Sequence, residues 1–128
     1  GIWVVVHLFV AGKVECRLMN QLLQVLAKKF KEVKFLKIVS QECIHNYPDK
    51  NCPTILIYKD GEMKKNVIGL GSYGGLKTTA DSLEYTLSTW GVLKTDLEED
   101  PREQLARMAM KTVRRKKGYD AGDDDDDQ

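Results

Sequence analysis

Apolar and polar positions follow one another along this chain in blocks that predict strands and helices. Residues 2–9 form a nearly continuous apolar, β-branched run, which is typical of a central strand covered on both faces. From about residue 15 to residue 31, apolar residues recur three and four positions apart, which predicts an amphipathic helix. The residues that define this spacing are Leu18, Leu22, Leu23, Val25, Leu26 and Phe30. Residues 33–39 return to a strand, so the two strands should be parallel and joined by a right-handed crossover.

The middle of the chain predicts a hairpin. Residues 41–47 allow only a short helix before Pro48. Residues 54–59 then form an apolar strand, and Asp60-Gly61 is the residue pair that favours a tight hairpin turn. Residues 62–68 should therefore pair with that strand in antiparallel orientation.

A glycine-rich loop and a second long helix complete the folded part. The loop covers residues 69–75, and the helix runs from about Thr78 to Trp90. The inner face of this helix should hold Leu83, Leu87 and Trp90. The order β-α-β-α-β-β-α predicts an α/β fold of the thioredoxin type, with a mixed four-stranded sheet and helices over both faces.

The C-terminal part has a different character. Asp100 is a helix-capping residue and Pro101 suits the first helical position, so a modest amphipathic helix is expected over residues 101–116. Its stripe would consist of Leu105, Met108, Ala109 and Thr112. The run Asp123–Asp127 repels itself and should be disordered. We thus expect a domain over residues 1–95, incomplete at its N-terminus, followed by a helix and an acidic tail over residues 96–128.

Charge separates the same two parts. The net charge is +1 over 128 residues, but residues 1–95 carry +5 and residues 96–128 carry −4. The lysines of the first part alternate with carboxylates, so a nucleic-acid partner is not expected. No apolar run approaches the roughly 20 residues that cross a bilayer. Three cysteines cannot form a closed set of disulfides, which favours reduced thiols in the cytoplasm.

Several segments resemble a known family. Residues 52–62, which begin Cys52-Pro53-Thr54, are similar to the proline-threonine strand and hairpin of thioredoxins, where the proline is cis. Segments 4–9, 31–35, 46–49 and 95–101 resemble the thioredoxin-like domain of phosducin-like proteins, most closely the second and third of that family. The resemblance covers about residues 1–101.

This resemblance implies a function. Its branch of the family consists of cytosolic partners of the eukaryotic chaperonin, so it implies docking on that chaperonin and modulation of actin or tubulin folding. Family members also carry an N-terminal helical segment that this sequence lacks. Phosducin itself binds the G-protein βγ dimer, and that activity depends on the missing segment.

The sequence argues against a redox enzyme. A dithiol oxidoreductase needs Cys-x-x-Cys at the start of its first helix. Alignment of the first strand and helix with thioredoxin places Cys16 at the second cysteine and Lys13 at the first. A lysine cannot attack a disulfide as a thiolate does. Cys16 and Cys52 are best interpreted as small buried hydrophobic residues, although a regulatory disulfide between them is an alternative.

Other motifs fit structural roles better than chemical ones. Gly69–Gly74 matches a dinucleotide fingerprint by spacing but follows a hairpin, so a turn with positive φ is the better explanation. Cys43, His45 and Cys52 lack the spacing and the fourth ligand of a zinc site. His7, inside an apolar strand, should be a hydrogen-bonded core residue. We therefore expect no catalytic, cofactor-binding or metal-binding residue.

Three surfaces are candidates for binding proteins. The first is the altered active-site face around Lys13, Cys16 and Cys52-Pro53, since thioredoxin-type faces pair with extended peptides. The second is a basic rim that can steer acidic partners, and the third is the helix over residues 101–116. The rim consists of Lys28, Lys29, Lys31 and Lys34. Arg114–Lys117 is a weak nuclear-import or phosphate-binding pattern.

The sequence thus predicts a cytoplasmic, monomeric, non-catalytic co-chaperone of the chaperonin. A βγ-binding regulator and a thiol oxidoreductase are the alternatives.

Overall fold

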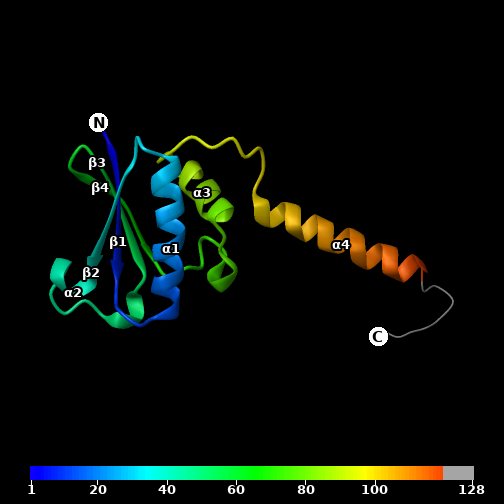
Figure 1. Ribbon diagram of the computed structural model, residues 1–128, viewed down its shortest axis with the longest axis horizontal. Helices are drawn as coiled ribbons and strands as arrows, with labels where there is room; N and C mark the ends of the chain where they lie inside the picture. The colour runs from blue at the N-terminus through cyan, green and yellow to red at the C-terminus, as the bar shows by residue number, and fades with distance from the viewer. Residues whose placement is uncertain (120–128) are drawn as a thin grey trace.

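The computed structural model of the protein describes residues 1–119, with side chains described through Val113. It contains a single mixed sheet with three helices packed near it and a fourth helix that leads away from it (Figure 1). Its strands are β1 (Trp3–Phe9), β2 (Lys34–Val39), β3 (Thr54–Lys59) and β4 (Glu62–Ile68). Its α-helices are α1 (Val14–Lys29), α2 (Ser40–Cys43), α3 (Ala80–Thr89) and α4 (Pro101–Tyr119).

The sheet has the strand order β2-β1-β3-β4 and confirms the predicted topology. β1 is parallel to β2, with Val5 opposite Phe35, and antiparallel to β3, with Val5 opposite Ile57. β3 and β4 form the predicted hairpin. Asp60 and Gly61 both have positive φ, 56° and 79°, which is the backbone geometry of a type I′ turn.

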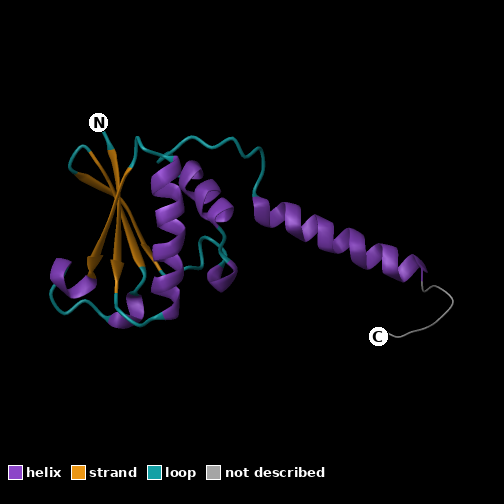
Figure 2. Ribbon diagram, in the orientation of Figure 1, coloured by secondary structure: helices purple, strands orange, loops and turns teal. Residues whose placement is uncertain are grey.

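The helices flank the sheet unequally. Figure 2 shows α1 and α3 together on one side of the strands, while only the short α2 lies on the other side, near the end of β2. The larger core lies between the sheet and the pair α1 and α3. Its members include Val5, Met19, Leu26, Ile57 and Leu87.

One residue of the predicted helical stripe was assigned wrongly. Val25 is 51% exposed, whereas Met19, which the prediction omitted, is fully buried. Residues three and four apart share a helix face, and Met19 is aligned with Leu23 and Leu26 on that rule. Val25 lies two positions from Leu23, on the solvent side of the same helix.

The glycine-rich loop enters the core instead of only turning the chain. Gly69 and Gly74 have positive φ, as predicted. Between them the Tyr73 side chain is fully buried, and its ring lies edge-on to the Trp90 ring at 5.9 Å between centroids. The loop therefore seals the end of the core beneath α3.

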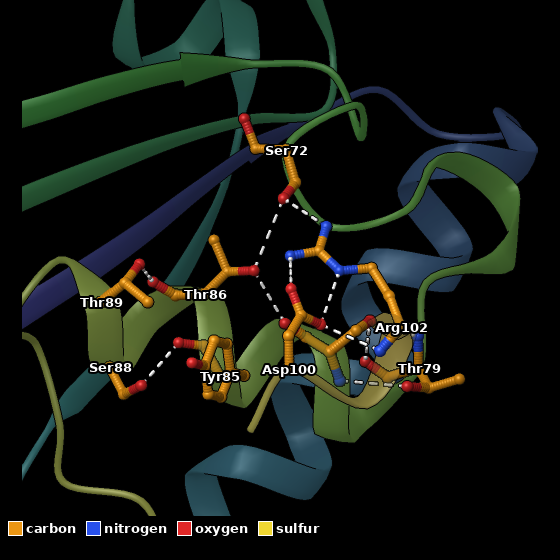
Figure 3. A network of polar contacts seen from close by, with 9 residues as sticks. Ser72, Thr79, Tyr85, Thr86, Ser88, Thr89, Asp100 and Arg102 are labelled. Atoms are coloured by element: carbon orange, nitrogen blue, oxygen red, sulfur yellow. Dashed lines mark hydrogen bonds and ion pairs between the residues drawn. The ribbon is translucent and has the colours of Figure 1, made fainter. Parts of the chain in front are cut away.

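Two capping arrangements start α3 and α4. Thr79 and Ser82 form a reciprocal capping box at α3. Asp100 caps α4 as predicted, since its Oδ1 accepts the Arg102 backbone N–H at 2.9 Å. The Arg102 guanidinium also donates to the Ser72 carbonyl oxygen at 3.0 Å, and Figure 3 shows how this contact ties the start of α4 to the glycine-rich loop. The helix extends to Tyr119, three residues beyond the predicted end.

Candidate functional site

A lysine closes the corner at the start of α1, where the sequence alignment predicts the first cysteine of a dithiol motif to lie. Lys13 is the N-cap residue of α1, in extended backbone conformation. Its ammonium group donates to the backbone carbonyl of Cys52 at 2.6 Å and to that of Asp49 at 3.1 Å. Charge-assisted hydrogen bonds of this kind are among the stronger ones in proteins. Lys13 thus joins the β1–α1 turn to the loop before β3.

Cys16 lies one turn inside α1 and is 1% exposed. Burial raises the pKa of its thiol most strongly, and the neighbouring Cys52 raises it further. A backbone hydrogen bond at Val10 and the charge of Lys13 act in the opposite direction without reversing the result. Because the thiolate is the reacting form of cysteine, this thiol is poorly suited to attack.

Cys52 and Pro53 form the opposite wall of the corner. The peptide bond between them is cis, as the resemblance implies, and Cys52 is 2% exposed. The Cys52 backbone N–H donates to the Asp49 carbonyl at 3.0 Å. The N–H of Cys52 is therefore engaged, and its C=O already accepts from Lys13.

His7 is buried in β1, as predicted. Its Nδ1 donates to the Asn20 Oδ1 at 2.8 Å, because an amide oxygen can only accept. Burial lowers the pKa of His7 to about 4, against the raising effect of that hydrogen bond. The imidazole is therefore neutral near pH 7 and fills the core.

A buried carboxylate links three segments, and no pattern in the sequence predicted it. Glu84 on α3 is 1% exposed; its Oε1 accepts from Lys29 at 2.8 Å and its Oε2 accepts from the Thr95 hydroxyl at 2.5 Å. The hydrogen bond to Glu84 raises the pKa of Lys29. One member of the predicted basic rim is thus committed to the body of the protein, while Lys28, Lys31 and Lys34 are exposed.

The clearest apolar surface lies on α4. Four large apolar side chains of this helix are more than half exposed: Leu105, Met108, Met110 and Val113. Leu105 and Met108 are three positions apart and share one face of the helix, so they form a candidate binding surface, whereas Met110 and Val113 lie on another side of the helix. The Arg114–Lys117 side chains and Asp123–Asp127, assigned from sequence to a basic patch and an acidic tail, lie outside the described part.

Among the described residues, no group of three or more His, Cys, Asp or Glu side chains is arranged to hold a metal ion. The helices in the same part of the chain are too short or too polar to cross a bilayer.

Comparison with known proteins decides the family. The family model described as Phosducin matches residues 2–117. The chain belongs to the phosducin family. It is 52% identical over 114 residues to phosducin-like protein 3 of Danio rerio and 51% identical over 114 residues to phosducin-like protein 2 of Dictyostelium discoideum. In each case the match covers 89% of this chain and 48% of the relative, so the chain spans about half the length of these relatives.

Solved structures show the fold of this phosducin-family chain. Fasciola hepatica thioredoxin is similar with a TM-score of 0.52 and 22% identity, over 73% of this chain and 83% of that chain. The Nicotiana alata thioredoxin NaTrxh is similar with a TM-score of 0.53 and 21% identity, over 69% of this chain and 72% of that chain. The predicted thioredoxin-like fold and the predicted family are both confirmed.

Proposed function

We propose that this phosducin-family chain is a non-catalytic protein-binding module of a co-chaperone, acting on the cytosolic chaperonin that folds actin and tubulin. The observation that carries the non-catalytic part is the contact from Lys13 to the Cys52 carbonyl. It places a bound ammonium group where dithiol chemistry needs a thiolate. The choice of the chaperonin as the partner rests on the family resemblance.

The closed corner argues against peptide capture in the manner of thioredoxin. An extended peptide that adds to a backbone edge needs free N–H and C=O groups. At Cys52 the N–H donates to Asp49, and the C=O accepts from Lys13. We therefore place the partner elsewhere on the surface.

The apolar surface of α4 is the better docking site. Figure 1 shows this helix leading away from the sheet, so a partner can reach it without displacing the core. Amphipathic helices bind grooves through apolar anchors spaced three and four residues apart. Leu105 and Met108 have that spacing and are 62% and 57% exposed.

Direct binding to purified cytosolic chaperonin tests this proposal. The wild-type chain, immobilised, should retain the chaperonin. The double variant Leu105→Asp with Met108→Asp should weaken retention at least about tenfold, since two buried apolar anchors contribute more than 1.4 kcal/mol. The matched control is Val25→Asp, because Val25 is similarly exposed on α1 at 51%.

A parallel capture with the purified G-protein βγ dimer separates the main alternative. Retention of the chaperonin but not βγ supports the proposal; retention of βγ alone favours a signalling regulator. Binding by a full-length relative such as phosducin-like protein 3 but not by this chain would assign the chaperonin contact to the part of that relative outside the match, and would contradict the module proposed here.

A further inference from the structure

The segment that joins α3 to α4 carries an unusual pattern. Residues 94–100 form neither helix nor strand. Within this segment, Thr95 is followed by four carboxylates in the next five residues: Asp96, Glu98, Glu99 and Asp100. A hydroxyl in irregular backbone, followed closely by acidic side chains, is the kind of substrate that acidophilic protein kinases accept.

The Thr95 hydroxyl also fixes this segment to the body of the protein. It donates to the Glu84 Oε2 at 2.5 Å and accepts the Leu97 backbone N–H at 3.1 Å. Glu84 is 1% exposed and its other oxygen accepts from Lys29. One hydroxyl therefore connects the linker to α3 and, through the carboxylate, to α1.

We propose that Thr95 is a phosphorylation site whose modification releases the linker and α4 from the body. An acidophilic protein kinase supplies ATP as the phosphoryl donor. The Thr95 Oγ1 attacks the γ-phosphorus, a new Oγ1–P bond forms, and the bond to the bridging oxygen breaks. ADP leaves with that electron pair, and the hydroxyl proton passes to the kinase's base.

Phosphorylation should release the linker for two reasons: it adds negative charge beside Glu84, and it removes the Thr95 hydroxyl hydrogen that Glu84 accepts. A phosphothreonine carries about −1.5 to −2 charges at pH 7, and its Oγ1 no longer bears a hydrogen to donate to Glu84. It would stand beside Glu84, a buried carboxylate that already has one ammonium partner in Lys29. Asp81 and Asp96 are also close enough to affect Lys29. One lysine among three carboxylates cannot neutralise the added phosphate.

Among the residues whose side chains are described, one further hydrogen bond, besides that of Thr95, joins this segment to the body. The Arg102 guanidinium donates to the Ser72 carbonyl at 3.0 Å (Figure 3), and Arg102 is itself paired with Asp100 in the same segment. The Arg102–Asp100 pair lies within the segment and does not attach it to the body, so the exposed hydrogen bond from Arg102 to Ser72 is the polar contact that remains. Loss of the Thr95 contact therefore leaves the linker weakly attached.

Two acidic side chains of the segment, Asp96 and Glu98, are exposed and have no ion pair among the described side chains, and Glu98 is the one that a kinase selective for an acid three residues after its acceptor would contact. Glu99 pairs with Arg107, and Asp100 pairs with Arg102. Glu98 is exposed, three residues after Thr95, with no ion pair among the residues whose side chains the structure describes. A kinase can therefore bind the Glu98 carboxylate without breaking an existing ion pair.

Phosphorylation of the whole chain by ATP and casein kinase 2, an acidophilic enzyme, tests the site. Mass spectrometry should place the phosphate on Thr95, and Thr95→Val should abolish that signal. Glu98→Gln should slow the reaction about tenfold, the loss of one charge-assisted hydrogen bond. Glu103→Gln, which removes a carboxylate outside the segment, should leave the rate unchanged. No phosphate at Thr95, or equal rates in the two glutamine variants, would overturn the assignment.

Amide hydrogen exchange of the phosphorylated chain tests the release. The Leu97 amide and the first turn of α4 should exchange at least about tenfold faster, while the amides of β1 and β3 keep their protection. Thr95→Val, which removes the hydroxyl without adding charge, should give a smaller increase. Unchanged exchange at Leu97 after phosphorylation would overturn the switch. These measurements use the isolated chain, so their outcome does not depend on the proposed chaperonin partner.

Discussion

The Lys13 ammonium group and the Cys52 backbone carbonyl lie 2.6 Å apart, although 39 residues separate them in the chain. The first residue stands at the start of α1, and the second precedes the strand β3. Their contact closes the corner between the start of α1 and the loop before β3. It is therefore expected to contribute to the stability of the loops on both sides.

Replacing Lys13 by methionine should lower the free energy of unfolding by about 1–2 kcal/mol. The reason is the loss of a charge-assisted hydrogen bond to the Cys52 carbonyl at a partly buried position. Urea unfolding measures the change. Lys31→Met, at an exposed lysine, is the control and should shift stability by less than about 0.5 kcal/mol. Equal effects of the two substitutions would show that the contact contributes nothing.

Replacing Lys13 by cysteine should create an oxidisable pair with Cys16. The two sulfurs would have the Cys-x-x-Cys spacing at the start of a helix, where thiols are activated and can form a disulfide. Mild oxidation should then remove two titratable thiols and lower the mass by two hydrogens. The double variant Lys13→Cys with Cys16→Ser should not form this intramolecular disulfide. If the single variant kept every thiol, this corner could not adopt the geometry of a Cys-x-x-Cys disulfide.

His7 should make stability depend on pH below neutrality. Burial lowers the pKa of His7 in the folded chain to about 4, from an ordinary value of 6.5. Between these values the unfolded chain binds a proton that the folded chain does not, so stability falls as pH drops from 6.5 to 4. The slope from this group is at most about 1.4 kcal/mol per pH unit.

Urea unfolding across that window checks the sign and the group. His7→Leu should have a flatter dependence on pH than wild type, because leucine does not titrate. His45→Gln removes the other histidine, which is exposed, and should keep the wild-type slope. A slope that follows His45 instead of His7 would contradict the assignment.

Two tyrosine substitutions should affect stability differently. The Tyr73 hydroxyl is buried without a hydrogen-bond partner among the described residues, and burial raises its pKa. Tyr73→Phe should therefore be neutral or stabilising by up to about 1 kcal/mol. The Tyr47 hydroxyl shares a hydrogen bond of 2.7 Å with Thr54, so Tyr47→Phe should cost about 1 kcal/mol. Thermal unfolding compares them, and a larger loss for Tyr73→Phe would contradict this account.

The fold followed from local signals. The Asp60-Gly61 pair predicted the hairpin because few residue pairs accept positive φ twice, and periodicity predicted the βαβ unit. The prediction included Val25 and omitted Met19 because α1 has apolar residues on more than one face. Their spacing alone does not determine which of these faces is buried. Only packing against the sheet settles which face turns inward.

The site was only partly predictable. The substitution at Lys13 is visible in the sequence, but its contact with Cys52 depends on two loops that meet in three dimensions. The buried Glu84 had no sequence signal, because a glutamate on an amphipathic helix usually faces water. Its partners Lys29 and Thr95 come from separate segments. Long-range polar contacts of this kind are set by the tertiary fold.

Insulin disulfide reduction under dithiothreitol tests most directly the claim that this corner no longer performs thiol exchange. The account predicts that the wild-type chain adds nothing to the uncatalysed rate and that Cys16→Ser behaves identically. Turnover by the wild-type chain that disappears in Cys16→Ser would contradict it, since Cys16 would then be an attacking thiolate despite its burial and the bound Lys13.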